Sequence, residues 1–214
     1  MTEIALKNLI ELIKTETDAE CLSSALESIC SLVCADEDDF HEGEIQIAKE
    51  TSIYLAKSSV HLELFLDSFD KTEFKVKWAA ARLLTALARE SPVVFQQVIQ
   101  ERPTGVSQMV DCLSSQNELI RNNSLLLLIA VAENSPILQK IIVFENCFEI
   151  LLRVSLTEGG IYNSPVSEDC LTLVLILLEN NQSNVTFFCE TALIPKLIDF
   201  IVSLDLDPNN WPEG

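Results

Sequence analysis

The sequence predicts an all-helical protein built as a solenoid of repeated layers. Residues 87–92, Leu-Ala-Arg-Glu-Ser-Pro, return 44 positions later at 131–136 as Val-Ala-Glu-Asn-Ser-Pro, and residues 131–134 return 46 positions later at 177–180. Each copy follows one long apolar helical pattern and precedes another. Apolar residues make up 48% of the chain, whereas five Gly and two Tyr are few for a β protein. This period is typical of armadillo or HEAT repeats, and layers of three helices favour armadillo over the two-helix HEAT unit. We therefore predict an armadillo-type right-handed superhelical solenoid.

The first two predicted helices, residues 2–14 and 19–34, form a weak N-terminal layer over residues 1–34. The second has an apolar stripe at helical spacing, made of Leu22, Ala25, Leu26, Ile29 and Val33. Residues 35–44 are acidic and have no periodic face, so we predict a loop there. Helical patterns resume at residues 45–57 and 60–69.

The clearest layers repeat three helices each, the third of them long. Ser91-Pro92 and Ser135-Pro136 each signal a helix start, because serine caps a helix and proline fits its first turn. The remaining predicted helices are 73–89, 92–100, 106–113, 119–133, 136–144, 147–156, 166–180, 185–191 and 193–204. We therefore assign residues 45–205 to armadillo repeats and 206–214 to a tail or linker. The third helices, 73–89, 119–133 and 166–180, are expected to line the concave side.

Composition excludes several classes of partner. Fourteen Lys and Arg against 33 Asp and Glu give a net charge of −19, which repels a phosphate backbone, so we expect no nucleic acid partner. No basic stripe is available for an anionic bilayer, and the longest purely apolar run, residues 125–132, is too short to span one. The N-terminus lacks a secretory pattern, and an odd number of cysteines, seven, fits reduced thiols. We therefore expect a cytoplasmic protein that meets membranes only through partners.

The sequence offers no recognisable catalytic or metal-binding motif. The two histidines, His41 and His61, lie in or beside unpatterned segments, and neither a Gly-rich phosphate loop nor a Gly-x-Ser-x-Gly turn occurs. Cys21, Cys30, Cys34 and His41 lack the closely spaced cysteine pairs typical of zinc sites. We predict that the chain is not an enzyme and needs no cofactor or metal. Cys112, Cys147 and Cys170 are expected in the core.

The concave side lacks the side-chain ladder by which nuclear-import receptors hold basic peptides. In that ladder each third helix carries an Asn near its end and a Trp one turn earlier. The Asn positions here hold Ala86, Ala130 and Ile176, and the Trp positions hold Arg82, Leu126 and Thr172. Trp78 lies one turn earlier still and alone, so we expect it in the core. Because the ladder is absent, we expect no tight binding of a basic peptide. Candidate residues for protein binding, which are equally plausible as ordinary solvated positions, are Arg82, Arg89, Arg121, Asn122, Glu168 and Asp169.

Several sequence segments in the second half of the chain resemble one family. In chain order these segments are QKIIVFENCFE (139–149), EGG (158–160), SEDCL (167–171) and LENNQSNVTFF (178–188). The preceding layer, with Leu119-Ile120-Arg121 and residues 133–136, fits in order and spacing. Together they resemble the armadillo head of the general vesicular transport factor family, long coiled-coil golgins that tether vesicles. The resemblance extends over about residues 65–197 and is weak before residue 45.

The resemblance implies a cytosolic tether that is peripheral to Golgi and vesicle membranes. That family acts in traffic from the endoplasmic reticulum to the Golgi with Rab-type GTPases, SNAREs and other golgins. Family members also have a long heptad-repeat tail, and no run of heptads follows residue 204 here. The alternative is a generic armadillo scaffold or adaptor in another cytosolic pathway.

Overall fold

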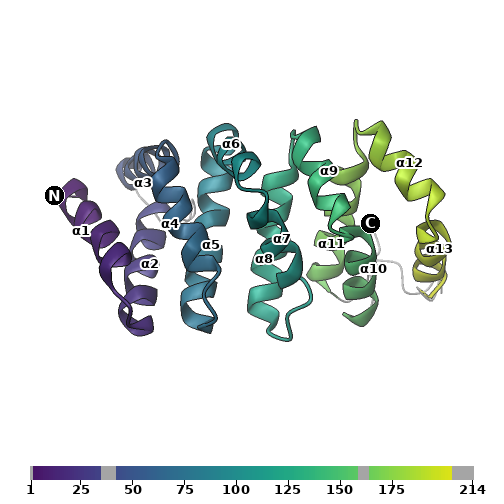
Figure 1. Ribbon diagram of the computed structural model, residues 1–214, viewed down its shortest axis with the longest axis horizontal. Helices are drawn as coiled ribbons and strands as arrows, with labels where there is room; N and C mark the ends of the chain where they lie inside the picture. Colours follow the sequence, from purple (N-terminus) through teal and green to yellow (C-terminus); the bar gives the residue numbers. More distant parts are fainter. Residues whose placement is uncertain (1, 35–41, 159–163, 204–214) are drawn as a thin grey trace. The chain divides into compact units, whose positions relative to one another are not determined.

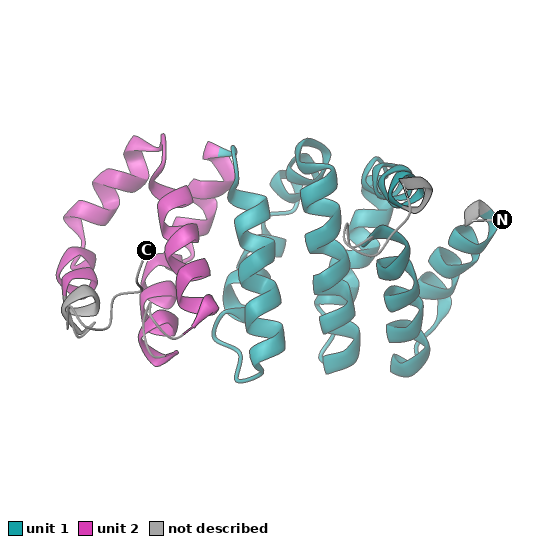
Figure 2. Ribbon diagram, turned by 180° about the vertical axis from the view of Figure 1, so that it is seen from behind, with its two compact units in different colours: residues 1–135 teal, residues 136–214 magenta. Residues whose placement is uncertain are grey.

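Helices are the only regular elements in the part of the chain that the structure describes. A computed structural model describes residues 2–34, 42–158 and 164–203, which hold thirteen α-helices (Figure 1). The chain divides into two compact units, Met1–Ser135 and Pro136–Gly214 (Figure 2). Most of the expected acidic loop, residues 35–41, and the expected tail, 206–214, lie outside the described residues.

The first unit begins with a helix pair and continues with two three-helix layers. Its helices are α1 (Thr2–Thr15), α2 (Ala19–Val33), α3 (Glu42–Ala56), α4 (Ser59–Phe69), α5 (Phe74–Glu90), α6 (Pro92–Glu101), α7 (Thr104–Cys112) and α8 (Glu118–Ala132). The long helices α2, α5 and α8 lie side by side, with α5 in contact with both of its neighbours (Figure 1). These three helices therefore share one face of the unit.

The second unit contains one three-helix layer and a closing helix pair. Its helices are α9 (Pro136–Phe144), α10 (Cys147–Thr157), α11 (Pro165–Leu178), α12 (Gln182–Glu190) and α13 (Leu193–Ser203). Helix α10 contacts α11 and α13, and α9 contacts α11 and α12. The predicted layer, in which two shorter helices precede a long third one, is thus present in both units, as α6–α8 and as α9–α11.

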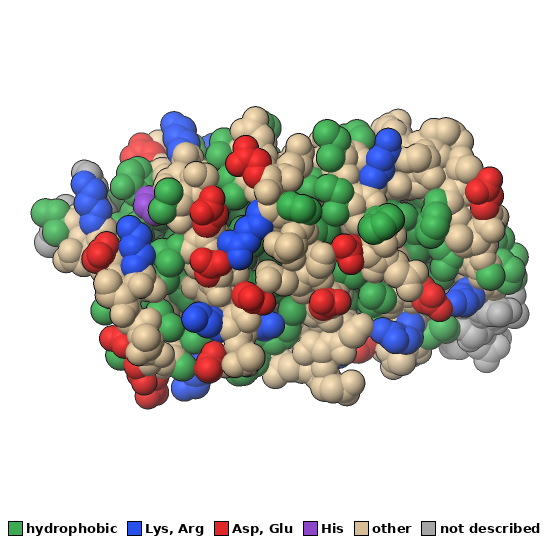
Figure 3. Space-filling model, viewed as in Figure 1, with side chains coloured by type: hydrophobic (Ala, Val, Ile, Leu, Met, Phe, Trp, Pro, Cys, Tyr) green, Lys and Arg blue, Asp and Glu red, His purple; other side chains and the backbone are tan. Residues whose placement is uncertain are grey.

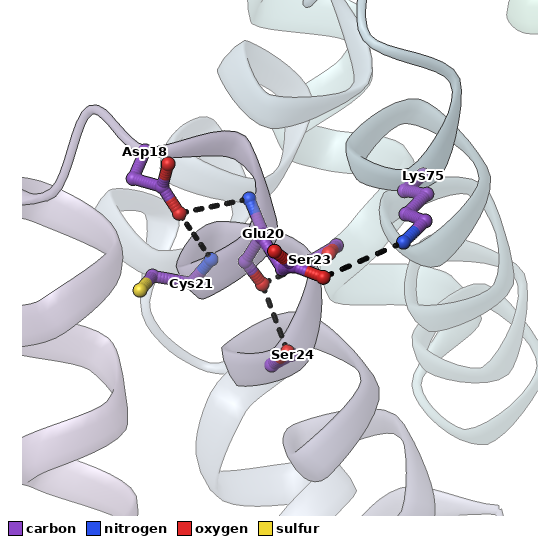
Figure 4. Close-up of polar contacts among 6 residues, drawn as sticks. All are labelled: Asp18, Glu20, Cys21, Ser23, Ser24 and Lys75. Atoms are coloured by element: carbon purple, nitrogen blue, oxygen red, sulfur yellow. Dashed lines mark hydrogen bonds and ion pairs between the residues drawn. The ribbon is translucent and has the colours of Figure 1, made fainter.

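Side-chain caps fix where several helices begin. The Asp18 carboxylate accepts hydrogen bonds from the backbone N–H groups of Glu20 and Cys21, at 3.1 and 2.9 Å, at the start of α2 (Figure 4). These bonds hold the pKa of Asp18 below its usual value, because they stabilise the carboxylate. Asn117 caps α8 and Ser164 caps α11 in the same manner. The backbone N–H groups of a helix's first turn have no partner within the helix, and in each of these cases the side chain just before the helix accepts from one or two of them.

The repeated phrase of the sequence marks where the long helices end. Asn134 and Asn180, which occupy equivalent positions, have left-handed backbones with φ of 56° and 53°. Asparagine tolerates this conformation better than most residues, and each Asn follows its helix by two positions. The first copy has Glu90 at that position, and there α5 continues through Glu90. The two copies with Asn at this position thus end in a left-handed turn, and the copy with Glu does not.

Helix α5 is the centre of the first unit's core. Nine of its residues are buried, including Ala79, Ala80 and Ala81 in succession. Small side chains let the neighbouring helices approach closely, and leucines at positions 83, 84 and 87 fill the space between them. The apolar helical pattern that predicted this helix from sequence is thus explained, because α5 is buried against several neighbouring helices.

Two predicted helix starts are wrong by three residues each. Helix α12 begins at Gln182, not at Val185. Helix α3 begins at Glu42, three residues before the expected start at Ile45, so Glu42, Gly43 and Glu44 are helical and do not belong to a loop. Apolar periodicity cannot detect a first turn of this kind, because it carries no apolar residue.

Candidate protein-binding surface

An aromatic and cationic row runs along α5 in the first unit. Phe74, Trp78 and Arg82 are spaced four residues apart, which places them on one side of the helix. The rings of Phe74 and Trp78 are stacked, with centroids 6.3 Å apart and planes 14° from parallel. The Arg82 guanidinium carbon lies 5.0 Å from the centre of the Trp78 ring. Such a cation–π contact contributes about 0.5–1 kcal/mol at an exposed site, so the arginine is held in place.

The row is open to solvent and continues to the end of α5. Phe74 is 40% exposed, Trp78 is half-buried, and Arg82 and Arg89 are exposed. Neither arginine forms an ion pair within the described residues. Sequence reasoning selected Arg82 and Arg89 but treated Trp78 as isolated and missed Phe74. The spacing of four between the two aromatic residues was the available signal.

The neighbouring α2 supplies acidic groups beside α5. Lys75 lies 3.8 Å from the Glu20 carboxylate, and both side chains are exposed (Figure 4). The pKa of Cys30 is raised by its contact with Cys34 and by burial. The charge of Glu27 on α2 also raises this pKa, whereas the charge of Arg82 lowers it. These contacts place charged groups of α2 close to those of α5. They also show that Lys75 is already matched with a carboxylate, whereas Arg82 is not.

Arg121 and Asn122 lie near the start of α8. The Arg121 guanidinium donates a hydrogen bond of 3.1 Å to the backbone oxygen of Ser115, so this side chain braces the turn before α8. The Asn122 side-chain oxygen is buried and has no hydrogen-bond partner among the described residues, and the same holds for the Trp78 indole nitrogen. Trp78 and Asn122 occupy equivalent positions, 44 residues apart, on adjacent helices.

Glu168 and Asp169 belong to the second unit. Both lie in the first turns of α11, where Glu168 is exposed and Asp169 is half-buried. Exposed apolar side chains also occur in this unit, with Phe144 88% and Leu175 68% exposed. In Figure 3, acidic and basic side chains are interspersed on the face that is shown, and no patch of one sign dominates it. The six candidate residues are therefore divided between the two units.

A cavity of about 420 Å³ opens in the first unit between the α4–α5 connection, the end of α7 and the start of α8. Its Lys77 ammonium lies 3.9 Å from the Cys112 sulfur and 5.6 Å from the centre of the Phe69 ring. Burial raises the pKa of the Cys112 thiol. Asp70 and Asp111 also line the cavity, which therefore presents charges of both signs. Sequence reasoning did not find this cavity, because its lining comes from three separate segments.

The cysteines are free thiols, and most are buried. Cys112, Cys147 and Cys170 lie in the core as expected, with exposures of 8%, 0% and 1%. Burial raises the pKa of Cys147, which keeps it a neutral thiol. Cys30 and Cys34 have sulfurs 3.6 Å apart, and His41 lies outside the described residues. Within the described ranges, no three His, Cys, Asp or Glu side chains form a group that could hold a metal ion.

None of the helices in the described ranges is both long and apolar enough to cross a membrane.

Comparison with known proteins decides the family. The chain is 34% identical over 200 residues, 90% of its length, to the general vesicular transport factor of Bos taurus. The chain is a homologue of the head region of the general vesicular transport factor family. This head-region homologue spans only 21% of the length of the bovine protein. The family resemblance expected from sequence is thereby confirmed.

Other relatives and solved structures agree. Identity is 36% over 143 residues, 67% of this chain and 8% of the relative, with the intracellular protein transport protein USO1 of Saccharomyces cerevisiae. It is 32% over 155 residues, 72% of this chain and 17% of the relative, with golgin candidate 6 of Arabidopsis thaliana. These relatives are named as transport factors and golgins, and none is named as an enzyme.

The crystal structure of Uso1-1 matches with a TM-score of 0.83 and 30% identity, covering 97% of this chain and 35% of that one. A designed armadillo repeat protein matches with a TM-score of 0.58 and 14% identity over 91% of both chains. The armadillo fold predicted from the repeat period is confirmed by these likenesses. No family model matches the chain.

Proposed function

We propose that this head-region homologue is a non-catalytic protein-binding module of a vesicle-tethering factor in traffic from the endoplasmic reticulum to the Golgi. The observation that carries the proposal is the 34% identity with a general vesicular transport factor over 90% of the chain. An armadillo fold supports it, because stacked helical layers bury their apolar faces against each other and leave long side-chain rows for partners.

The partners we propose are Rab-type GTPases, SNAREs and other golgins. The module meets Golgi and vesicle membranes from the cytosol, and only through these proteins. Its relatives' names, a vesicular transport factor and a golgin candidate, support this placement. A net charge of −19 also opposes direct adsorption to anionic lipid headgroups.

A binding assay with purified partners tests the proposal. The full chain is immobilised and offered Rab-type GTPases of the early secretory pathway, each loaded with GDP or with a non-hydrolysable GTP analogue. The cytosolic domains of Golgi SNAREs are offered separately. We expect saturable binding of at least one of these proteins, and preference for the GTP form where a GTPase binds.

The outcome that contradicts the proposal is equally concrete. An importin subunit and a ubiquitin-ligase subunit serve as controls for the alternative of a generic armadillo scaffold. Binding of a control, together with no binding of any GTPase, SNARE or golgin, would replace the tethering role with the scaffold role. Flotation with anionic vesicles completes the test, since direct lipid binding without a partner would contradict the proposed route to membranes.

A further inference from the structure

The exposed aromatic and cationic row of α5 has the length and chemistry of a peptide-binding strip. We call this row, Phe74, Trp78, Arg82 and Arg89, the α5 ridge. At a rise of about 1.5 Å per residue, its fifteen-residue span covers roughly 23 Å of helix. An extended chain advances about 3.3 Å per residue, so roughly seven residues of a partner lie along it. The ridge combines two stacked aromatic rings at one end with two guanidinium groups toward the other.

Charge on this ridge is opposite in sign to that of the chain as a whole. Helix α5 carries two lysines and two arginines against one glutamate, in a protein with a net charge of −19. Arg82 and Arg89 nevertheless have no carboxylate within ion-pair distance in the described part of the chain. Lys75, by contrast, is paired with Glu20. At physiological ionic strength charges are screened beyond about 8 Å, so the two arginines supply positive charge to the ridge itself despite the negative charge of the whole chain.

Arg82 is also held ready for a ligand. Its guanidinium lies over the Trp78 ring, and the stacking of Phe74 on Trp78 fixes that ring in turn. A guanidinium stacked on an aromatic face keeps its edge N–H groups available, and these match a carboxylate in a bidentate manner. Because the side chain is already ordered, less conformational entropy is lost when a carboxylate binds.

We propose that the α5 ridge binds an extended segment of a partner protein that carries an apolar residue followed by two acidic residues. The spacing follows from the helix: Trp78 and Arg82 are about 6 Å apart along the axis, and Arg82 and Arg89 about 10 Å. In an extended chain these intervals correspond to about two and three residues. The motif is therefore apolar-x-acidic-x-x-acidic, and this inference rests on the protein-binding role proposed above.

Trp78 provides a direct readout. The chain has two tryptophans, so the full chain with Trp211→Phe leaves Trp78 as the only tryptophan fluorophore. The probe is the blocked peptide Ser-Leu-Ser-Glu-Ser-Ser-Glu-Ser, compared with versions in which both Glu are replaced by Gln or by Lys. We expect a saturable change in Trp78 fluorescence with the Glu peptide. Binding should be at least about tenfold weaker with the Gln peptide and absent with the Lys peptide, because two charge-assisted pairs are lost or reversed.

Matched variants locate the effect, with affinities measured by calorimetry so that changes in Trp78 emission do not interfere. Arg82→Gln and Arg89→Gln should each weaken binding about threefold to fivefold, since an exposed ion pair contributes up to about 1 kcal/mol. The double variant should lose about tenfold or more, and Arg82→Lys should fall between wild type and Arg82→Gln. Lys49→Gln, an equal charge change on exposed α3, should bind within about twofold of wild type. All three positions are exposed, so folding is preserved and is checked by circular dichroism.

Three results would overturn the inference. These are equal binding of the Glu and Gln peptides, equal effects of Arg82→Gln and Lys49→Gln, and no saturable binding of the Glu peptide. The unmodified chain and the double variant are both offered to the GTPases, SNAREs and golgins of the binding assay. Capture of these proteins by both forms, with no peptide binding, removes the role of the ridge and leaves the proposed function standing. Capture by neither form removes the proposed function itself.

Discussion

A buried amide links two helices of the second unit, and its removal gives a strong test of the structure. The Asn181 side-chain nitrogen donates to the Pro136 backbone oxygen at 3.1 Å and to the Gln139 side-chain oxygen at 3.0 Å. Its own oxygen accepts from the Ser183 hydroxyl at 2.9 Å. Asn181 and Gln139 are each only 4% exposed. Asn181 precedes α12, whereas Pro136 and Gln139 belong to α9, so this one side chain fastens the two helices together.

Asn181→Ala should destabilise the second unit by about 3–5 kcal/mol. Each of the two donated hydrogen bonds contributes about 1 kcal/mol net, and a buried carbonyl that loses its donor costs about 1–3 kcal/mol more. Urea unfolding followed by circular dichroism measures the loss, and hydrogen exchange should locate it in α9 and α12. Ser183→Ala is the control, because it removes only the bond at the exposed end and should cost less than about 1 kcal/mol.

A double-mutant cycle separates the contact from general loss of packing. Asn181→Ala and Gln139→Ala should be less destabilising together than the sum of the two, by about 1–2 kcal/mol, since either change alone breaks the same bond. Strictly additive effects, or an Asn181→Ala variant no less stable than Ser183→Ala, would refute this reasoning.

Three further predictions concern single positions in the first unit. Gly105→Ala should raise the free energy of unfolding by about 0.5–1 kcal/mol, because its methyl group would lie at ordinary contact distances of 3.6 and 3.7 Å from two aliphatic side chains. A fall in melting temperature would instead indicate overpacking. Burial and the nearby charge of Lys14 lower the pKa of His61. The unfolded state therefore takes up this proton first as pH falls below about 6.5, and stability should decline from there to the folded pKa. His61→Gln should remove that part of the pH profile and His41→Gln should keep it; identical profiles would contradict the assignment. Asn122→Leu should leave stability unchanged or raise it by up to about 1 kcal/mol, since the Asn oxygen is buried without a partner. A loss of more than about 1 kcal/mol in urea unfolding would show that the oxygen is satisfied in solution.

Local signals in the sequence were sufficient to place the helices. Pro92 and Pro136 begin α6 and α9 as expected, and the equivalent residues Asn134 and Asn180 end α8 and α11. Helix periodicity, caps and left-handed turns all depend on residues within a few positions of one another. The start of α3 at Glu42 escaped prediction because a polar first turn leaves no apolar pattern.

Contacts between helices could not be read in this way. Sequence reasoning chose Arg82, Arg89 and Asn122 by their place on third helices, and it could not show that the Asn122 oxygen is buried without a partner. The four-residue spacing of Trp78 and Arg82 was visible in the sequence, but the contact between their side chains was not. Sequence reasoning also missed Phe74 and the cavity around Lys77. These features depend on the rotamers and separation of side chains in different turns or different helices.

By itself the sequence determined the helical repeat, its layer order and the family, because each is encoded in residues that are close together or in phrases that recur at a fixed period. Only the tertiary structure decided which side chains became buried, paired or left exposed. Helices separated by tens of residues must pack before a guanidinium has, or lacks, a carboxylate beside it, and no local pattern specifies that distance.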